Sequence, residues 1–105
     1  MTKSIVINFI NEFSNKGQWP QVIECFTCGN CYWFAYILHG RFPYGAIAYD
    51  EVANHFGCMI NDAVYDITGD VTDKYYWEPW GEVYNRDPIH GARIIRDCID
   101  KIPSR

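Results

Sequence analysis

Cys25-Phe-Thr-Cys28-Gly-Asn-Cys31-Tyr-Trp-Phe-Ala-Tyr-Ile-Leu38 decides the fold, because it changes from a polar turn into an apolar run with a cysteine at the junction. Four residues recur with the i, i+3, i+4, i+7 spacing of one helix face: Cys31, Phe34, Ala35 and Leu38. Gly29 supplies the preceding turn and Asn30 is a suitable N-cap. We therefore predict a helix over residues 31–39.

Cys31 would lie in the first turn of this helix. Unpaired backbone N–H groups and the helix macrodipole favour negative charge there. Such an environment lowers the pKa of a thiol and favours the reactive thiolate. Of the five cysteines in the chain, Cys31 is the predicted nucleophile.

The composition predicts one globular domain over residues 1–105, with 49% hydrophobic and 21% charged residues. A net charge of −4 and scattered basic residues argue against a nucleic-acid partner. The sequence contains no apolar run long enough for a membrane span, so we expect no membrane partner and a cytoplasmic location. An odd number of cysteines fits free thiols in a reducing compartment.

The remaining segments predict an α+β fold. Apolar periodicity indicates a first helix over residues 4–16, followed by a loop over 17–30. Residues 46–49 suit a short strand. The aromatic run 75–80 suits a loop or an edge strand, since Pro79 excludes central pairing. Asp87 and Pro88 resemble the N-cap and first residue of a last helix over 89–99, for which a strand is the alternative.

Asn61 and Asp62 lie between two apolar runs and predict a hairpin turn. Opposite residues in this hairpin have numbers that sum to 123, so that His55 and Asp66 are diagonal neighbours on one face. Gly57 would leave the space between them open.

A thiol at a helix start, a histidine that opens a later strand and an acid on the next strand match nucleophilic catalysis. We assign Cys31 as nucleophile, His55 as base and then acid, and Asp66 as the group that orients the imidazole. Backbone N–H groups at the helix start would stabilise an oxyanion. This chemistry requires no metal or other cofactor. Each residue also has a structural alternative: a core thiol, a satisfied polar histidine and a turn former.

Three segments together resemble the papain-like cysteine hydrolase superfamily: 29–38, Asn54-His55-Phe56, and Val64-Tyr65-Asp66-Ile67-Thr68-Gly69. The transglutaminase-like and NlpC/P60-like groups look closest. The resemblance implies a minimal papain-like core, with N-terminal helices packed on a small antiparallel sheet. It also implies the triad Cys31, His55 and Asp66, and cleavage or exchange of amide bonds in a peptide or amide-containing substrate.

Asn30, Trp77 and Trp80 are the predicted substrate-binding residues, although the two tryptophans could equally form a lid that closes the core.

Three other functions remain open. The spacing Cys25, Cys28, Cys31 resembles part of a metal-binding run, which Cys58 or His55 could complete. Cys28 and Cys31 also resemble a redox C-x-x-C pair. Finally, the fold could be a non-catalytic binding or inhibitory module for a protein partner, of bacterial or phage origin.

Overall fold

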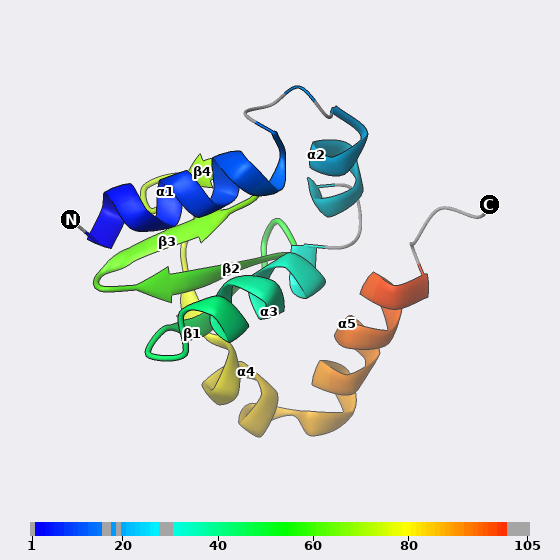
Figure 1. Cartoon of the computed structure of the whole chain (residues 1–105). Coiled ribbons are helices and arrows are strands. Elements are labelled where there is room, and N and C mark those ends of the chain that lie inside the picture. Colours follow the sequence, from blue (N-terminus) through cyan, green and yellow to red (C-terminus); the bar gives the residue numbers. More distant parts are fainter. Residues whose placement is uncertain (1, 16–17, 19, 28–30, 101–105) are drawn as a thin grey trace.

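A computed structural model describes residues 2–15, 18, 20–27 and 31–100. It shows a small, compact α+β fold in which helices pack on a five-stranded antiparallel sheet (Figure 1). The helices are α1 (Thr2–Phe13), α2 (Pro20–Thr27), α3 (Cys31–Arg41), α4 (Trp80–Arg86) and α5 (Pro88–Asp100). Among the described residues, none of these helices has both the length and the apolar character needed to cross a membrane.

The sheet has the strand order β4-β3-β2-β1-β5. Its strands are β1 (Ala46–Asp50), β2 (His55–Ile60), β3 (Ala63–Asp66), β4 (Gly69–Asp70) and β5 (Glu78–Pro79). The β2–β3 hairpin has the predicted register, with pairs such as Cys58 and Tyr65 whose numbers sum to 123. Its turn residues Asn61 and Asp62 have φ of 49° and 66°, as a two-residue type I′ turn requires.

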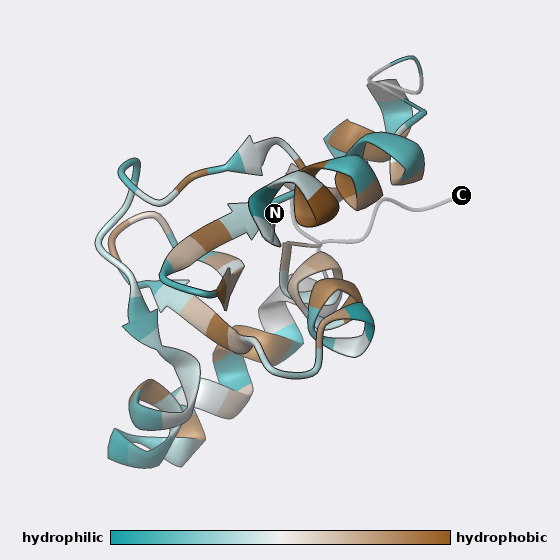
Figure 2. Ribbon diagram, turned by 60° about the vertical axis from the view of Figure 1, so that its left-hand side comes forward, coloured by the Kyte–Doolittle hydropathy of each residue, from teal (hydrophilic) through white to brown (hydrophobic). Residues whose placement is uncertain are grey.

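One face of the sheet is covered by helices. Nine buried residues from α1, α3, the sheet and its loops form the first core cluster: Val6, Ile10, Phe34, Leu38, Phe42, Cys58, Ile60, Tyr65 and Ile67. A second cluster joins α3, β1 and β2 to α4 and α5, and includes Cys31, Phe56 and Trp80. Hydrophobic and hydrophilic segments alternate along the helices, as expected for elements with one buried face (Figure 2).

The opposite face of the sheet is covered by the segment that connects β4 to β5. Ala48, Val64 and Val71 form a small third cluster there, against which Tyr75 and Trp77 pack. Gly57 lies beneath these rings, and a Cβ atom at this position would approach Val64 Cγ1 to 2.7 Å and Trp77 Cη2 to 3.1 Å. An indole from the returning chain therefore fills the space next to Gly57.

Of the last two helices, the sequence predicted α5 but not α4. α5 is helical from Pro88, and the Asp87 carboxylate accepts a hydrogen bond from the backbone N–H of His90 at 3.1 Å, as an N-cap should. The sequence did not predict α4, which starts directly after the edge strand at Pro79 and buries Trp80 and Val83.

The N-terminal region differs from prediction in two respects. The first helix is α1, which ends at Phe13 rather than at residue 16. The predicted loop over 17–30 contains helix α2, whose Val22, Ile23 and Phe26 pack against the first core cluster. Pro20 is the first residue of α2, and proline is favoured at the first position of a helix. The predicted turn and N-cap at Gly29 and Asn30 lie outside the described residues.

Candidate active site

His55 and Asp66 are joined by a hydrogen bond between neighbouring strands. His55 Nε2 donates to Asp66 Oδ2 at 2.7 Å, and the two residues are 8% and 5% exposed. His55 opens β2 and Asp66 ends β3, so that the hairpin register brings the two side chains together. This contact follows from the two-residue turn, as the sequence predicted.

Cys31 is the first residue of α3 and is 5% exposed. Its thiol lies close enough to His55 for a side-chain hydrogen bond, and both this bond and the negative charge of a thiolate raise the pKa of His55. Because Nε2 is engaged by Asp66, Nδ1 is the imidazole nitrogen that remains for the sulfur. The structure thus brings together Cys31, His55 and Asp66 from a helix and two strands.

The carboxylate of Asp66 has partners on both oxygens. Oδ1 accepts hydrogen bonds from the backbone N–H of Thr68, at 2.7 Å, and from the Thr68 hydroxyl. Asp66 is therefore both a turn former and the partner of His55, two roles that the sequence analysis treated as alternatives. The Asp-x-Thr spacing is the signal for this arrangement, and Asp70 and Thr72 repeat it.

Opposing effects set the charge states of the pair. Burial lowers the pKa of His55, but the hydrogen bonds with Asp66 and Cys31 and their negative charges outweigh it and raise the pKa to about 9. Burial raises the pKa of Asp66, but hydrogen bonds from His55 and Thr68 outweigh it, so that this pKa is lowered. At neutral pH the site therefore holds an imidazolium beside a carboxylate.

Two aromatic rings cover the imidazole. The ring centroid of Tyr75 lies 4.9 Å from that of His55, and the centroid of Trp77 lies 5.9 Å away. Trp77 Nε1 donates to the carbonyl of Val71 at 3.1 Å, which fixes the indole over the sheet. The rings limit the access of water to the imidazole and restrict its rotation. No spacing signal in the sequence would place Tyr75 here.

A family model described as "Phage YunG-like protein" matches residues 6–91. The chain belongs to the phage YunG-like protein family. The matched region of this phage YunG-like chain runs from α1 into α5 and includes Cys31, His55 and Asp66. Membership supports the expected phage or bacterial origin. Neither the curated proteins nor the solved structures include a significant match to the chain.

The predicted substrate-binding residues occupy different environments in this phage YunG-like chain. Trp77 lines a cavity of about 650 Å³ on the loop-covered face of the sheet. Trp80 is 7% exposed and lies in the second core cluster, and it also lines a shallower depression with Tyr36 and His39. Asn30 lies outside the described residues. A role of these residues in substrate binding stays a prediction.

The other cysteines of this phage YunG-like chain bear on the metal and redox alternatives. Cys58 is fully buried in the first core cluster, where burial raises its pKa to about 11. It faces the helices, away from His55, as strand alternation predicted. Cys25 belongs to α2, which replaces the strand that a thioredoxin-like motif would follow. Cys28 and the side chains of Cys25 and Cys98 lie outside the part of the chain that the structure describes.

Proposed function

We propose that this phage YunG-like protein is a cysteine-dependent amide hydrolase or acyl transferase with a papain-like triad of Cys31, His55 and Asp66. The observation that carries the proposal is the position of the His55 imidazole, which is hydrogen-bonded to the Asp66 carboxylate and lies within side-chain hydrogen-bond reach of the Cys31 thiol. This order of nucleophile, base and orienting acid is the arrangement that acyl transfer uses.

In the proposed reaction, the Cys31 thiolate attacks the carbonyl carbon of the substrate. Backbone N–H groups at the start of α3 lie at the positive end of the helix dipole, where Cys31 is located, and would stabilise the oxyanion. The His55 imidazolium then protonates the leaving amine, which departs as the C–N bond breaks and leaves a thioester on Cys31. Neutral His55 next removes a proton from water, for hydrolysis, or from an amine, for transfer, and Cys31 is released as the thiolate.

Asp66 has a positioning and electrostatic role in this scheme. Its charge stabilises the imidazolium, and its hydrogen bond to Nε2 holds the ring so that Nδ1 faces Cys31. Thr68 in turn fixes the carboxylate. Tyr75 and Trp77 exclude water from one side of the ion pair, which strengthens its electrostatics.

The alternative of a non-catalytic binding module is favoured by one observation. Cys31 and His55 are only 5% and 8% exposed, so that little of either side chain is available to a substrate. In such a module the same three residues would stabilise the junction between α3 and the sheet, and the thiol would be unreactive.

The two functions are separated by acylation with p-nitrophenyl acetate, an activated ester that needs no specific substrate pocket. We expect a burst of p-nitrophenol and an acetyl group on the Cys31 peptide, with both lost in Cys31→Ala and slowed in His55→Ala. Addition of hydroxylamine should then yield acetohydroxamate by transfer. Buried Cys58 is the internal control and should remain unmodified. Absence of acetyl-Cys31 in the folded protein, or a rate that His55→Ala leaves unchanged, would favour the binding module.

A further inference from the structure

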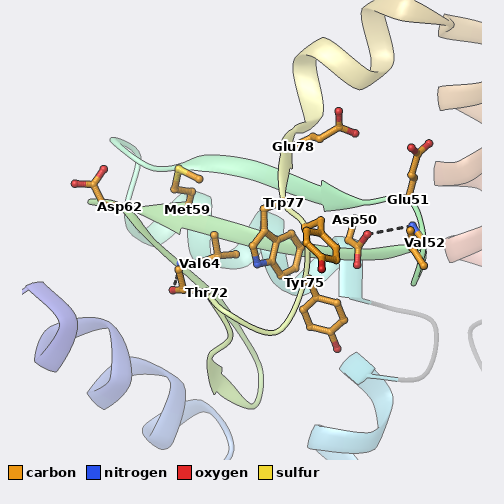
Figure 3. A pocket seen from close by; sticks show the side chains of 11 residues that line it. Asp50, Glu51, Val52, Met59, Asp62, Val64, Thr72, Tyr75, Trp77 and Glu78 are labelled. Atoms are coloured by element: carbon orange, nitrogen blue, oxygen red, sulfur yellow. Dashed lines mark hydrogen bonds between the residues drawn. The ribbon is translucent and has the colours of Figure 1, made fainter.

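No step of the proposed reaction takes place in the cavity on the loop-covered face of the sheet, although two of its lining residues, Tyr75 and Trp77, also cover His55. Its volume of about 650 Å³ lies within the usual range of small-molecule sites. Figure 3 shows the rings of Tyr75 and Trp77 side by side at its centre, with Asp50 and Glu51 at one end and Met59 and Asp62 at the other. Acidic groups and aromatic faces thus line the same concave surface.

Asp50 is the buried carboxylate of this cavity. It is 4% exposed, and its Oδ1 accepts one hydrogen bond, from the backbone N–H of Val52 at 3.0 Å. Within the described residues, Oδ2 has neither a hydrogen bond nor an ion pair. His55 lies opposite Asp50 in the β1–β2 register, but the hydrogen-bonded partner of its imidazole is Asp66. Oδ2 keeps some accessible surface, so a cation or donor that enters the cavity can reach it.

The other acids of the cavity are more exposed and partly neutralised. Glu78 forms an ion pair with Arg86 at 3.3 Å, and the negative charge of Glu51 also raises the pKa of Arg86. Arg86 is not among the residues that line the cavity, where every charged side chain is acidic. Asp50 is thus the most buried of the acidic side chains that line the cavity.

The aromatic walls favour the same ligand chemistry. The faces of tryptophan and tyrosine attract ammonium and guanidinium groups, and tryptophan does so most strongly. Trp77 is held by its bond to the Val71 carbonyl, so that its ring is preorganised, whereas Tyr76 at the rim is 87% exposed. Met59 and Val64 add an apolar surface that suits the methylene stem of such a cation.

We propose that the cavity formed by Asp50, Tyr75 and Trp77 binds an organic cation, namely an ammonium or guanidinium group on an aliphatic stem. Two sources share this chemistry: a lysine or arginine side chain of a peptide, and a free polyamine. The site does not require a reactive Cys31, so its test is independent of the proposed function.

The test is an NMR titration of the ¹⁵N-labelled full chain with N-acetyl-lysine amide and with N-acetyl-norleucine amide, which has a similar stem without the charge. We expect the lysine compound to shift the indole N–H signal of Trp77 and to bind at least about tenfold more tightly, which corresponds to about 1.4 kcal/mol. Equal binding of the two compounds, or shifts confined to other parts of the chain, would overturn the proposal without any variant.

Asp50→Asn supplies the second test, since the amide oxygen can still accept the Val52 N–H. It should remove most of the preference for the lysine compound. Asp73→Asn is the matched control, because Asp73 is exposed, lies in the segment that carries Tyr75 and Trp77, and does not line the cavity. Equal losses in both variants would indicate a general charge effect and contradict the proposal. Titration with 1,5-diaminopentane assigns the source: tighter binding than that of the lysine compound indicates a polyamine, and weaker binding indicates a peptide.

Discussion

His55 Nε2 and Asp66 Oδ2 lie 2.7 Å apart, although the two residues are eleven positions apart in the chain. A two-residue turn and strand pairing are sufficient to bring them together. The same imidazole contacts Cys31 at the start of α3, so that one ring links the helix to the hairpin.

Asp66→Asn keeps the shape of the side chain and removes its charge. The pKa of His55 should fall below about 9, because the carboxylate that stabilises the imidazolium is lost. The measurement is an NMR titration of the imidazole. Asp70→Asn is the control, since Asp70 has the same contacts with Thr72 but is paired with Lys3. A His55 pKa that is unchanged in Asp66→Asn, or lowered equally in Asp70→Asn, would contradict this role.

The free energy of unfolding should depend on pH through His55. Folding raises its pKa from 6.5 to about 9, so the imidazolium stabilises the fold fully below pH 6.5, and this contribution is lost as pH rises to about 9. At 1.36 kcal/mol per pKa unit, its upper limit is on the order of 3 kcal/mol. Urea unfolding under reducing conditions at about pH 6 and about pH 9.5 measures the loss. His55→Gln should show a smaller loss than the unsubstituted protein; equal losses would refute the assignment.

The contribution of Asp66 to the free energy of unfolding has the opposite pH dependence and is lost at acid pH. Its pKa is lowered in the fold, so its contribution is present above the unfolded value of 3.8 and is lost as pH falls through the folded value. The Asp66→Asn protein should therefore lose less stability between neutral and strongly acid pH than the unsubstituted protein. Equal acid sensitivity of the two proteins would show that other carboxylates dominate.

Gly57→Ala should destabilise the fold and displace Trp77. The new Cβ would lie 2.7 Å from Val64 Cγ1 and 3.1 Å from both Trp77 Cη2 and the Tyr65 carbonyl oxygen. Overpacking of this kind costs about 1–3 kcal/mol. Gly40→Ala is the matched control, because a Cβ there meets nothing within 4 Å, and alanine should stabilise α3 by about 0.5–1 kcal/mol. Urea unfolding measures both changes. An unchanged free energy of unfolding in Gly57→Ala would mean that the indole does not pack on this strand.

Removal of the α5 cap has a smaller predicted effect. Asp87→Ala loses the acceptor of the His90 N–H and should cost about 0.5–2 kcal/mol of folding stability. Asp87→Ser, which can still cap, should restore most of this loss. Equal stabilities of the alanine and serine variants would show that the side-chain cap contributes little.

Local signals predicted the elements that carry the candidate triad. The apolar spacing after Cys31 predicted α3, and the Asn61-Asp62 turn predicted the register that brings Asp66 to His55. Both depend on interactions between near neighbours in the sequence. The contact between His55 and Asp66 could therefore be predicted from the sequence alone.

The elements that were missed depend on tertiary packing. α2 has only eight residues, lies within the predicted loop over 17–30 and buries its apolar face against α1 and α3. α4 begins directly after Pro79, contains Gly81, a residue of low helix propensity, and is held by Trp80 in the second core cluster. The placement of Tyr75 and Trp77 over His55 requires the chain to return across the sheet, and no local pattern encodes that return.

The rate of Cys31 alkylation as a function of pH tests the central claim most directly. Iodoacetamide labelling, quantified for each cysteine peptide by mass spectrometry, should show Cys31 reacting well below pH 8, with Cys58 unreacted because it is buried and its pKa is raised to about 11. His55→Ala should move the Cys31 profile to higher pH. A Cys31 that reacts only near the ordinary thiol pKa of about 8.5, with a profile unaffected by His55→Ala, would contradict the account.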